Sequence, residues 1–149
     1  MATRAAIIME VKGKDHSYEG VYLHFDGYPE GAGKKLVNHY RTPASVANLI
    51  SHGGISVLGE MIGEKFDFDE KTPPQQCKFY HRDRGENLDI ALLGNPNYPD
   101  DRIRMVEDYA HDCGAEFIYL YTNGRWTFKP AHNGFNNLEP HLKNIELQS

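Results

Sequence analysis

A glycine-rich segment between an expected strand and an expected helix has the composition of an anion-binding turn. The segment, residues 26–35, contains three glycines and a proline and ends in two lysines. Glycine lets the backbone approach a ligand closely, and the amides at a helix start can point toward an anion. The glycine spacing matches neither a P-loop nor a dinucleotide fingerprint. Two interpretations stay open: a purely structural turn with solvated lysines, or a phosphate contact made by Gly31, Gly33, Lys34 and Lys35.

Basic and aromatic residues elsewhere could complete such a ligand site. Arg82 and Arg84 flank an acidic residue, and guanidinium groups bind phosphate or carboxylate in a bidentate manner. The competing interpretation is an internal ion pair, which contributes only about 0–1 kcal/mol where it is exposed. Tyr22 and Tyr28 are expected to be exposed, where their rings could stack on a nucleotide base. The predicted ligand-binding residues are therefore Tyr22, Tyr28, Gly31, Gly33, Lys34, Lys35, Arg82 and Arg84.

Two His-x-Asp pairs offer an alternative chemistry. His24 and Asp26 lie one residue apart on an expected strand, and His81 and Asp83 repeat this spacing. Side chains at positions i and i+2 of a strand share a face, so neighbouring strands would bring all four groups around a metal ion. However, aspartates at strand ends also form turns, and these spacings are not a zinc signature. The primary expectation is a protein without a metal or other cofactor, and the chain contains no G-x-S-x-G nucleophile motif.

Two pairs of strand-like segments predict the β-hairpins that would hold these residues. Residues 4–12 and 20–26 flank a polar turn, as in an antiparallel pair. Residues 116–122 and 125–129 flank Asn123-Gly124, the strongest short hairpin signal. The expected core-facing side chains of the second strand are Val21, Leu23 and Phe25.

Helices are expected between and after the hairpins. Glycine and capping signals predict one helix over residues 31–41 and a second that begins after Thr42 and ends at the Gly53-Gly54 pair. A third, over residues 100–113, has two aspartates in its first turn and ends at Gly114.

Signals in the remaining segments are weaker. Apolar residues within 55–62 favour a short buried helix, and residues 76–83 a third strand. Residues 88–93 would either extend the sheet or form a short helix. The end of the chain is polar, with a short helix expected over 138–147.

Composition and element order define the fold class. A chain of 149 residues, 40% hydrophobic and 25% charged, fits one globular domain. Helices and strands follow one another without a regular βαβ rhythm. We therefore expect a single α+β domain over residues 4–130, with a mainly antiparallel sheet of two hairpins packed against three or more helices, and a polar tail over residues 131–149.

Net charge and cysteine count limit the partners and the location. The net charge of −5 is opposite to that of a general nucleic-acid binder, which neutralises phosphates with basic residues. No apolar run approaches the roughly 20 residues of a membrane span. Two cysteines are too few for a secreted disulfide scaffold. These observations favour a cytoplasmic protein whose partner is a small molecule or another protein.

Three motifs together resemble a family of small bacteriophage accessory proteins. They are HFDGYPEGAG at residues 24–33, YHRDRGE at 80–86 and AEFIYLY at 115–121, and the resemblance spans about residues 4–130. It implies a phage-encoded product acting in the cytoplasm of the host bacterium, where such proteins often antagonise host defence or host metabolism. It carries over no catalytic residue.

The resulting hypothesis is a non-catalytic antagonist of host defence that binds a nucleotide-like or other anionic signal. Two alternatives stay open: a small metal-dependent nucleotide hydrolase or phosphodiesterase that uses the His-x-Asp pairs, and a protein–protein inhibitor of a host factor. A ligand pocket formed between protomers would require a homo-oligomer.

Overall fold

A mixed β-sheet with helices on both faces forms the centre of the molecule. The computed structural model describes residues 2–130 and 136–138. The strands are β1 (Ala5–Glu10), β2 (Tyr18–Leu23), β3 (Ile55–Val57), β4 (Lys78–Phe79), β5 (Ala91–Leu93), β6 (Phe117–Thr122), β7 (Arg125–Pro130) and β8 (Asn136–Asn137). The helices are the π-helical turn η1 (Pro29–Gly33), α1 (Lys34–His39), α2 (Pro43–Ser51), α3 (Tyr80–Arg84), the 3₁₀ turn η2 (Pro99–Asp101) and α4 (Arg102–Cys113).

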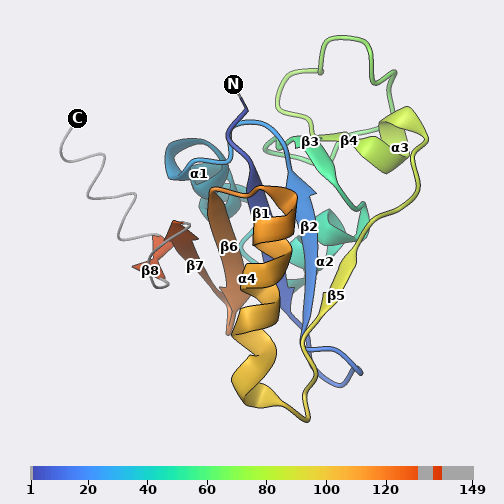
Figure 1. Ribbon diagram of the computed structural model, residues 1–149. Coiled ribbons are helices and arrows are strands. Elements are labelled where there is room, and N and C mark those ends of the chain that lie inside the picture. Colours follow the sequence, from blue (N-terminus) through green and yellow to red (C-terminus); the bar gives the residue numbers. More distant parts are fainter. Residues whose placement is uncertain (1, 131–135, 139–149) are drawn as a thin grey trace, which may run out of the picture.

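The strand order is β4-β3-β2-β1-β6-β7-β8, and β5 also pairs with β2. Helix α4 lies across one face of the sheet, and α1 and α2 lie on the other (Figure 1). The pairs β1–β6 and β2–β3 are parallel, and the other named pairs are antiparallel. The predicted α+β fold is therefore confirmed, although the parallel pairing at the centre of the sheet was not predicted.

Both predicted hairpins are present. Strand β1 pairs with β2, and β6 pairs with β7. In the second hairpin Asn123 and Gly124 have φ of 51° and 75°, the left-handed conformations that a two-residue turn between twisted strands requires. The parallel contact between β1 and β6 joins the two hairpins into one sheet.

The central strand is buried on both faces, which explains its continuous apolar sequence. Ala5 and Ile7 of β1 belong to the larger core beneath α1 and α2, while Ala6 and Ile8 contribute to the smaller core beneath α4. All four are fully buried. The larger core also contains Trp126, which fixes the second hairpin to the loop after α1.

Local signals at the helix ends predicted α1, α2 and α4, but not α3. The Thr42 side chain accepts a hydrogen bond from the Ser45 amide at the start of α2, and the Ser45 hydroxyl accepts one from the Thr42 amide. Gly114 ends α4 with φ of 70°. The first predicted helix consists of η1 followed by α1. None of the helices in the described part of the chain combines the length and apolarity of a membrane span.

Three expectations from the sequence are wrong. Residues 55–57 form strand β3 rather than a buried helix, because they pair with β2 and β4. The predicted third strand is limited to Lys78–Phe79, and the chain then turns into α3. Phe25 is 43% exposed rather than in the core, since β2 ends at Leu23.

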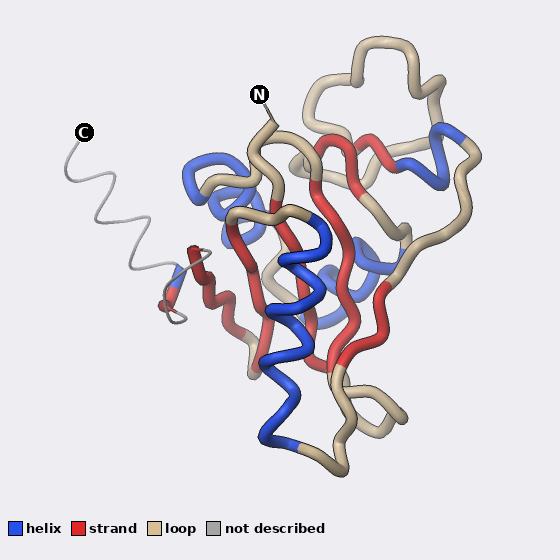
Figure 2. The backbone as a smooth tube through the Cα atoms, viewed as in Figure 1, coloured by secondary structure: helices blue, strands red, loops and turns tan. Residues whose placement is uncertain are grey.

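For residues 88–93 two structures were expected, a further strand or a short helix, and the strand is present. Residues 91–93 extend the sheet as β5, antiparallel to β2. The long connection from β3 to β4 is drawn as loop in Figure 2. The helix expected over 138–147 lies, except for Leu138, outside the described residues.

Candidate functional site

The backbone amides of the glycine-rich turn donate hydrogen bonds to carbonyl groups of the same turn. The Gly31 amide donates to the Tyr28 carbonyl at 3.0 Å, and the Ala32 amide to the Asp26 carbonyl at 3.0 Å. The Lys34 amide donates to carbonyls within η1, and Pro29 has no amide hydrogen. These donors are therefore already engaged, and the geometry favours the structural interpretation of the turn.

Close packing explains the two glycines that were predicted to contact a ligand. A Cβ on Gly31 would lie 2.7 Å from the Asp26 carbonyl oxygen. A Cβ on Gly33 would lie 3.0 Å from Leu138 and 3.3 Å from Tyr119. Both positions lack a side chain because the chain and the core approach the turn so closely.

The predicted cations and aromatic ring of the turn do not converge. Lys35 donates through Nζ to the Leu58 carbonyl at 2.9 Å and lines a small cavity beside residues 57–60 and 72–76. Lys34 is exposed and directly precedes Lys35 in α1. Adjacent residues of a helix point in different directions, so the two lysine side chains do not face a common site. Tyr28 is exposed, and it does not line that cavity.

Gly31→Ala tests the structural role of the turn. We expect a loss of about 1–3 kcal/mol in the free energy of unfolding, because the backbone of Asp26 must move to admit the methyl group. Urea unfolding followed by circular dichroism measures this loss. Asn38→Ala, at an exposed position of α1, is the matched control and should change stability by less than about 0.5 kcal/mol. Equal stability of the two variants would contradict the close packing.

The predicted guanidinium clamp is engaged within the protein at Arg82. Its Nε donates to Asp83 Oδ1 at 2.9 Å, and Nη2 donates to Asp83 Oδ2 at 3.2 Å and to the Cys77 carbonyl at 3.1 Å. Its Nη1 donates to the carbonyls of Ile62 and Gly63, each at 3.0 Å. A guanidinium has five N–H donors, so Arg82 has none left for a ligand.

Asp83 completes this arrangement from the interior. Its carboxylate is fully buried and accepts hydrogen bonds from the Phe79 amide at 2.8 Å and the Phe66 amide at 3.1 Å. The bond from Phe79 closes the first turn of α3, which is why the chain leaves the strand there. The Arg82–Asp83 ion pair therefore anchors the long loop between β3 and β4.

The alternative metal site is not assembled. His24 Nδ1 lies 2.6 Å from the Tyr22 hydroxyl, and His81 Nδ1 lies 2.7 Å from the Glu86 carbonyl oxygen. Asp83 is occupied by the contacts above, and Asp26 is exposed in the turn after β2. Within residues 2–130 and 136–138, no group of three His, Cys, Asp or Glu side chains could hold a metal ion.

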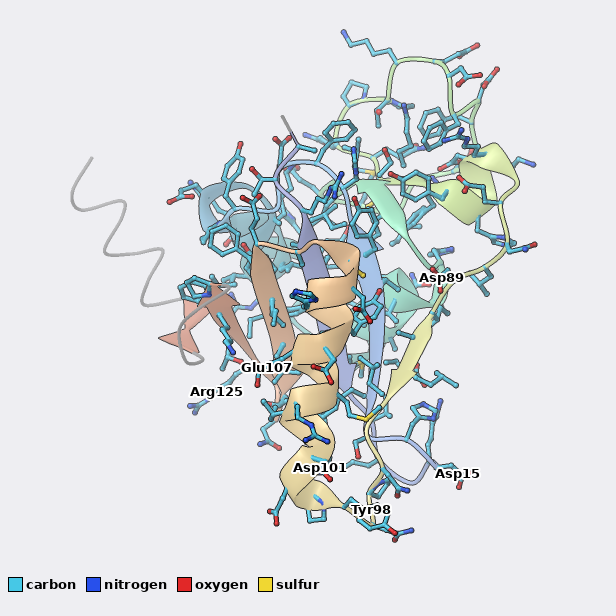
Figure 3. The ribbon with its side chains drawn as sticks, viewed as in Figure 1. Asp15, Asp89, Tyr98, Asp101, Glu107 and Arg125 are labelled. Carbon is cyan, nitrogen blue, oxygen red and sulfur yellow. The ribbon has the colours of Figure 1, made fainter. Side chains whose placement is uncertain are left out.

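An open cavity beside β2 is lined by residues from four parts of the chain, one of which is Gly54 before β3. Tyr22 comes from β2, Tyr80 begins α3, and residues 85–89 connect α3 to β5. The volume is about 790 Å³. Figure 3 shows Asp89 on the connection that descends from α3 to β5. We call this the Tyr22–Tyr80 cavity; its lining residues are Tyr22, Gly54, Tyr80, Gly85, Glu86, Asn87, Leu88 and Asp89.

Both tyrosine hydroxyls of the cavity stay protonated at neutral pH. Burial raises the pKa of Tyr22, and the positive charge of Arg4 offsets part of that shift. Burial also raises the pKa of Tyr80; a hydrogen bond with Ser56 lowers it, the Glu86 charge raises it, and Arg84 and Arg4 lower it. Each hydroxyl already has a partner within the protein, His24 Nδ1 for Tyr22 and Ser56 for Tyr80, so the two side chains offer a ligand their aromatic rings.

Charges of both signs surround the cavity. Arg84 lies with its Nε 3.7 Å from Glu86 Oε2 and with its guanidinium 5.1 Å from the Phe68 ring centre. The Phe68 ring in turn lies 5.5 Å from Tyr80. The arrangement thus combines an aromatic wall, two carboxylates and nearby arginines.

The structure brings together only two of the predicted ligand residues, Tyr22 in the cavity wall and Arg84 beside it. Sequence reasoning missed Tyr80 and residues 85–89 as ligand-contacting positions. Their signal was the position of Tyr80 and Gly85 inside the same YHRDRGE motif as the arginines.

The fold and this cavity define a small α+β domain with an open, aromatic-lined surface site. No model of a known protein family, no curated protein and no solved structure matches the chain.

Proposed function

We propose that the protein is a non-catalytic binding protein that sequesters a small nucleotide-like ligand in the Tyr22–Tyr80 cavity. The observation that carries the proposal is an open cavity of about 790 Å³ that is lined by two tyrosines from separate elements. That volume lies within the roughly 300–1,000 Å³ typical of small-molecule sites.

A planar, negatively charged ligand fits the surroundings of the cavity. Stacking of a base on an aromatic ring contributes about 1–3 kcal/mol. The charge of Arg4 acts on both tyrosine hydroxyls, and within the described residues no side-chain hydrogen bond involves its guanidinium. Arg4 can therefore take the phosphate-binding role that the lysines of the glycine-rich turn were expected to have.

The biological setting that we propose is a phage accessory protein that antagonises host defence in the bacterial cytoplasm. Support comes from the motifs that carry the resemblance: YHRDRGE supplies Tyr80, Gly85 and Glu86 to the cavity, and His24 of the first motif contacts Tyr22. Sequestration needs no nucleophile or metal, and its effect depends on affinity and abundance alone.

Tyr22→Ala tests the proposal. Isothermal titration calorimetry with the four nucleoside 5′-monophosphates and their cyclic dinucleotides should find a ligand for the wild type. Loss of the ring should weaken its binding by about 5–150-fold, the equivalent of one stacking contact. Tyr98→Ala, which removes a tyrosine that is 63% exposed outside the cavity, should bind as the wild type does.

Two results would contradict sequestration. One is a Tyr22→Ala variant that retains wild-type affinity and a wild-type unfolding midpoint. The other is an unliganded mass for the native protein purified from phage-infected cells, together with a co-purified host protein. That second result would support the protein–protein inhibitor instead.

A further inference from the structure

Residues 85–89 form one side of the cavity lining, and their polar groups indicate which kind of nucleotide the cavity would bind. This inference rests on the proposed function. Glu86, Asn87 and Asp89 line the same cavity as the two tyrosines. Within the described residues, no hydrogen bond or ion pair involves the Asp89 carboxylate. Ionised carboxylates only accept hydrogen bonds, so this wall favours a ligand edge that presents donors.

A positive charge near the cavity comes from Arg4, which is exposed and lies beside Gly114 at the end of α4. Arg4 immediately precedes β1, which pairs with β2 beside Tyr22. The charge of Asp89 acts on Tyr109 and Cys113, so Asp89 and Arg4 both lie near the C-terminal half of α4. A ligand that contacts the carboxylates and also reaches Arg4 needs both hydrogen-bond donors and an anionic group.

We propose that the cavity selects a guanine nucleotide, with the Asp89 and Glu86 carboxylates accepting from the base and Arg4 binding the phosphate. Guanine presents two adjacent donors, N1–H and the N2 amino group, which a carboxylate can accept in a bidentate manner. Adenine, cytosine and uracil each place a ring acceptor or a carbonyl next to their donor. Those lone pairs would face the carboxylates without a partner, which costs binding energy.

Titration calorimetry with GMP, IMP, AMP and UMP tests the base selection. IMP differs from GMP only by the missing N2 amino group, so it isolates the bidentate contact. We expect GMP to bind about 10-fold more tightly than IMP or AMP, the discrimination of one good bidentate pair. Asp89→Asn should remove most of that preference, because an amide presents a donor where the carboxylate has an acceptor.

Two further variants separate the base contact from the phosphate contact. Arg4→Gln should weaken all four monophosphates by a similar factor and leave the preference for GMP unchanged. Asp69→Asn, an exposed carboxylate outside the cavity, is the matched control and should bind as the wild type does. The unfolding midpoint of every variant, followed by circular dichroism, checks that the fold is retained.

The outcomes distinguish this inference from the function on which it rests. Equal affinity for GMP and AMP, or an unchanged preference in Asp89→Asn, would overturn guanine selection while leaving nucleotide sequestration in place. Absence of binding by all four nucleotides and by cyclic dinucleotides at millimolar concentration would overturn both.

Discussion

Asp83→Ala is expected to lower the free energy of unfolding by about 3–5 kcal/mol, because it removes one partner of a buried ion pair. The Asp83 side chain is fully buried, and the Arg82 side chain is only 14% exposed. Alanine would leave the Phe66 and Phe79 amides without an acceptor and Arg82 without its counter-charge. Thermal unfolding should show a midpoint lower by roughly 6–20 °C for a domain of this size.

The control is Asp108→Ala, an exposed carboxylate on α4, which should stay within about 0.5 kcal/mol of the wild type. The double variant Arg82→Met with Asp83→Ala removes both charges and should recover part of the loss. A loss below about 1 kcal/mol in Asp83→Ala would mean that the ion pair does not anchor the loop. Because Tyr80 begins the same helix, the single variant should also weaken ligand binding.

Trp126→Ala is expected to cost about 3–5 kcal/mol, the range for a large aromatic side chain in a core. Trp126 is buried in the larger core, with its ring centre 5.1 Å from that of Tyr121 in an edge-to-face contact. Its Nε1 donates to the Tyr40 carbonyl at 2.8 Å. This bond joins the second hairpin to the end of α1, so both should loosen together. Chemical unfolding followed by circular dichroism measures the loss.

Trp126→Phe separates packing from hydrogen bonding at this position. It keeps an aromatic ring but leaves the Tyr40 carbonyl without its donor, so we expect a smaller loss of about 1–3 kcal/mol. Arg125→Ala, the exposed neighbour on the same strand, should be nearly neutral. If Trp126→Ala were as stable as Arg125→Ala, the indole would not be the anchor of the hairpin.

Elements with complete local signals could be predicted from the sequence. The Asn123-Gly124 turn, the Thr42 cap and the Gly114 stop each depend on the backbone conformation or side-chain oxygen of a few adjacent residues. Such preferences act within one turn of chain. Both hairpins, and the helices expected over residues 31–41, after Thr42 and over residues 100–113, followed from them.

Elements that depend on contacts with residues far away in the sequence could not be predicted from the sequence. Residues 55–57 read as part of a helix by composition, but they pair with β2 and β4 in the sheet. Residues 76–83 were expected to form one strand, yet the Asp83 carboxylate accepts a hydrogen bond from the Phe79 amide and the chain forms α3 from Tyr80. In both cases hydrogen bonds outweighed the local propensity.

The same distinction between local signals and long-range contacts applies to the candidate site. The sequence by itself determined the residue types available for ligand binding and the tight glycine-rich turn, since both follow from local composition and backbone freedom. Only the tertiary structure decided which of these groups form hydrogen bonds within the protein. The turn amides, Lys35 and Arg82 all donate hydrogen bonds to other groups of the chain. It also decided that Tyr22 and Tyr80 share one cavity, because that proximity depends on how β2 and α3 pack.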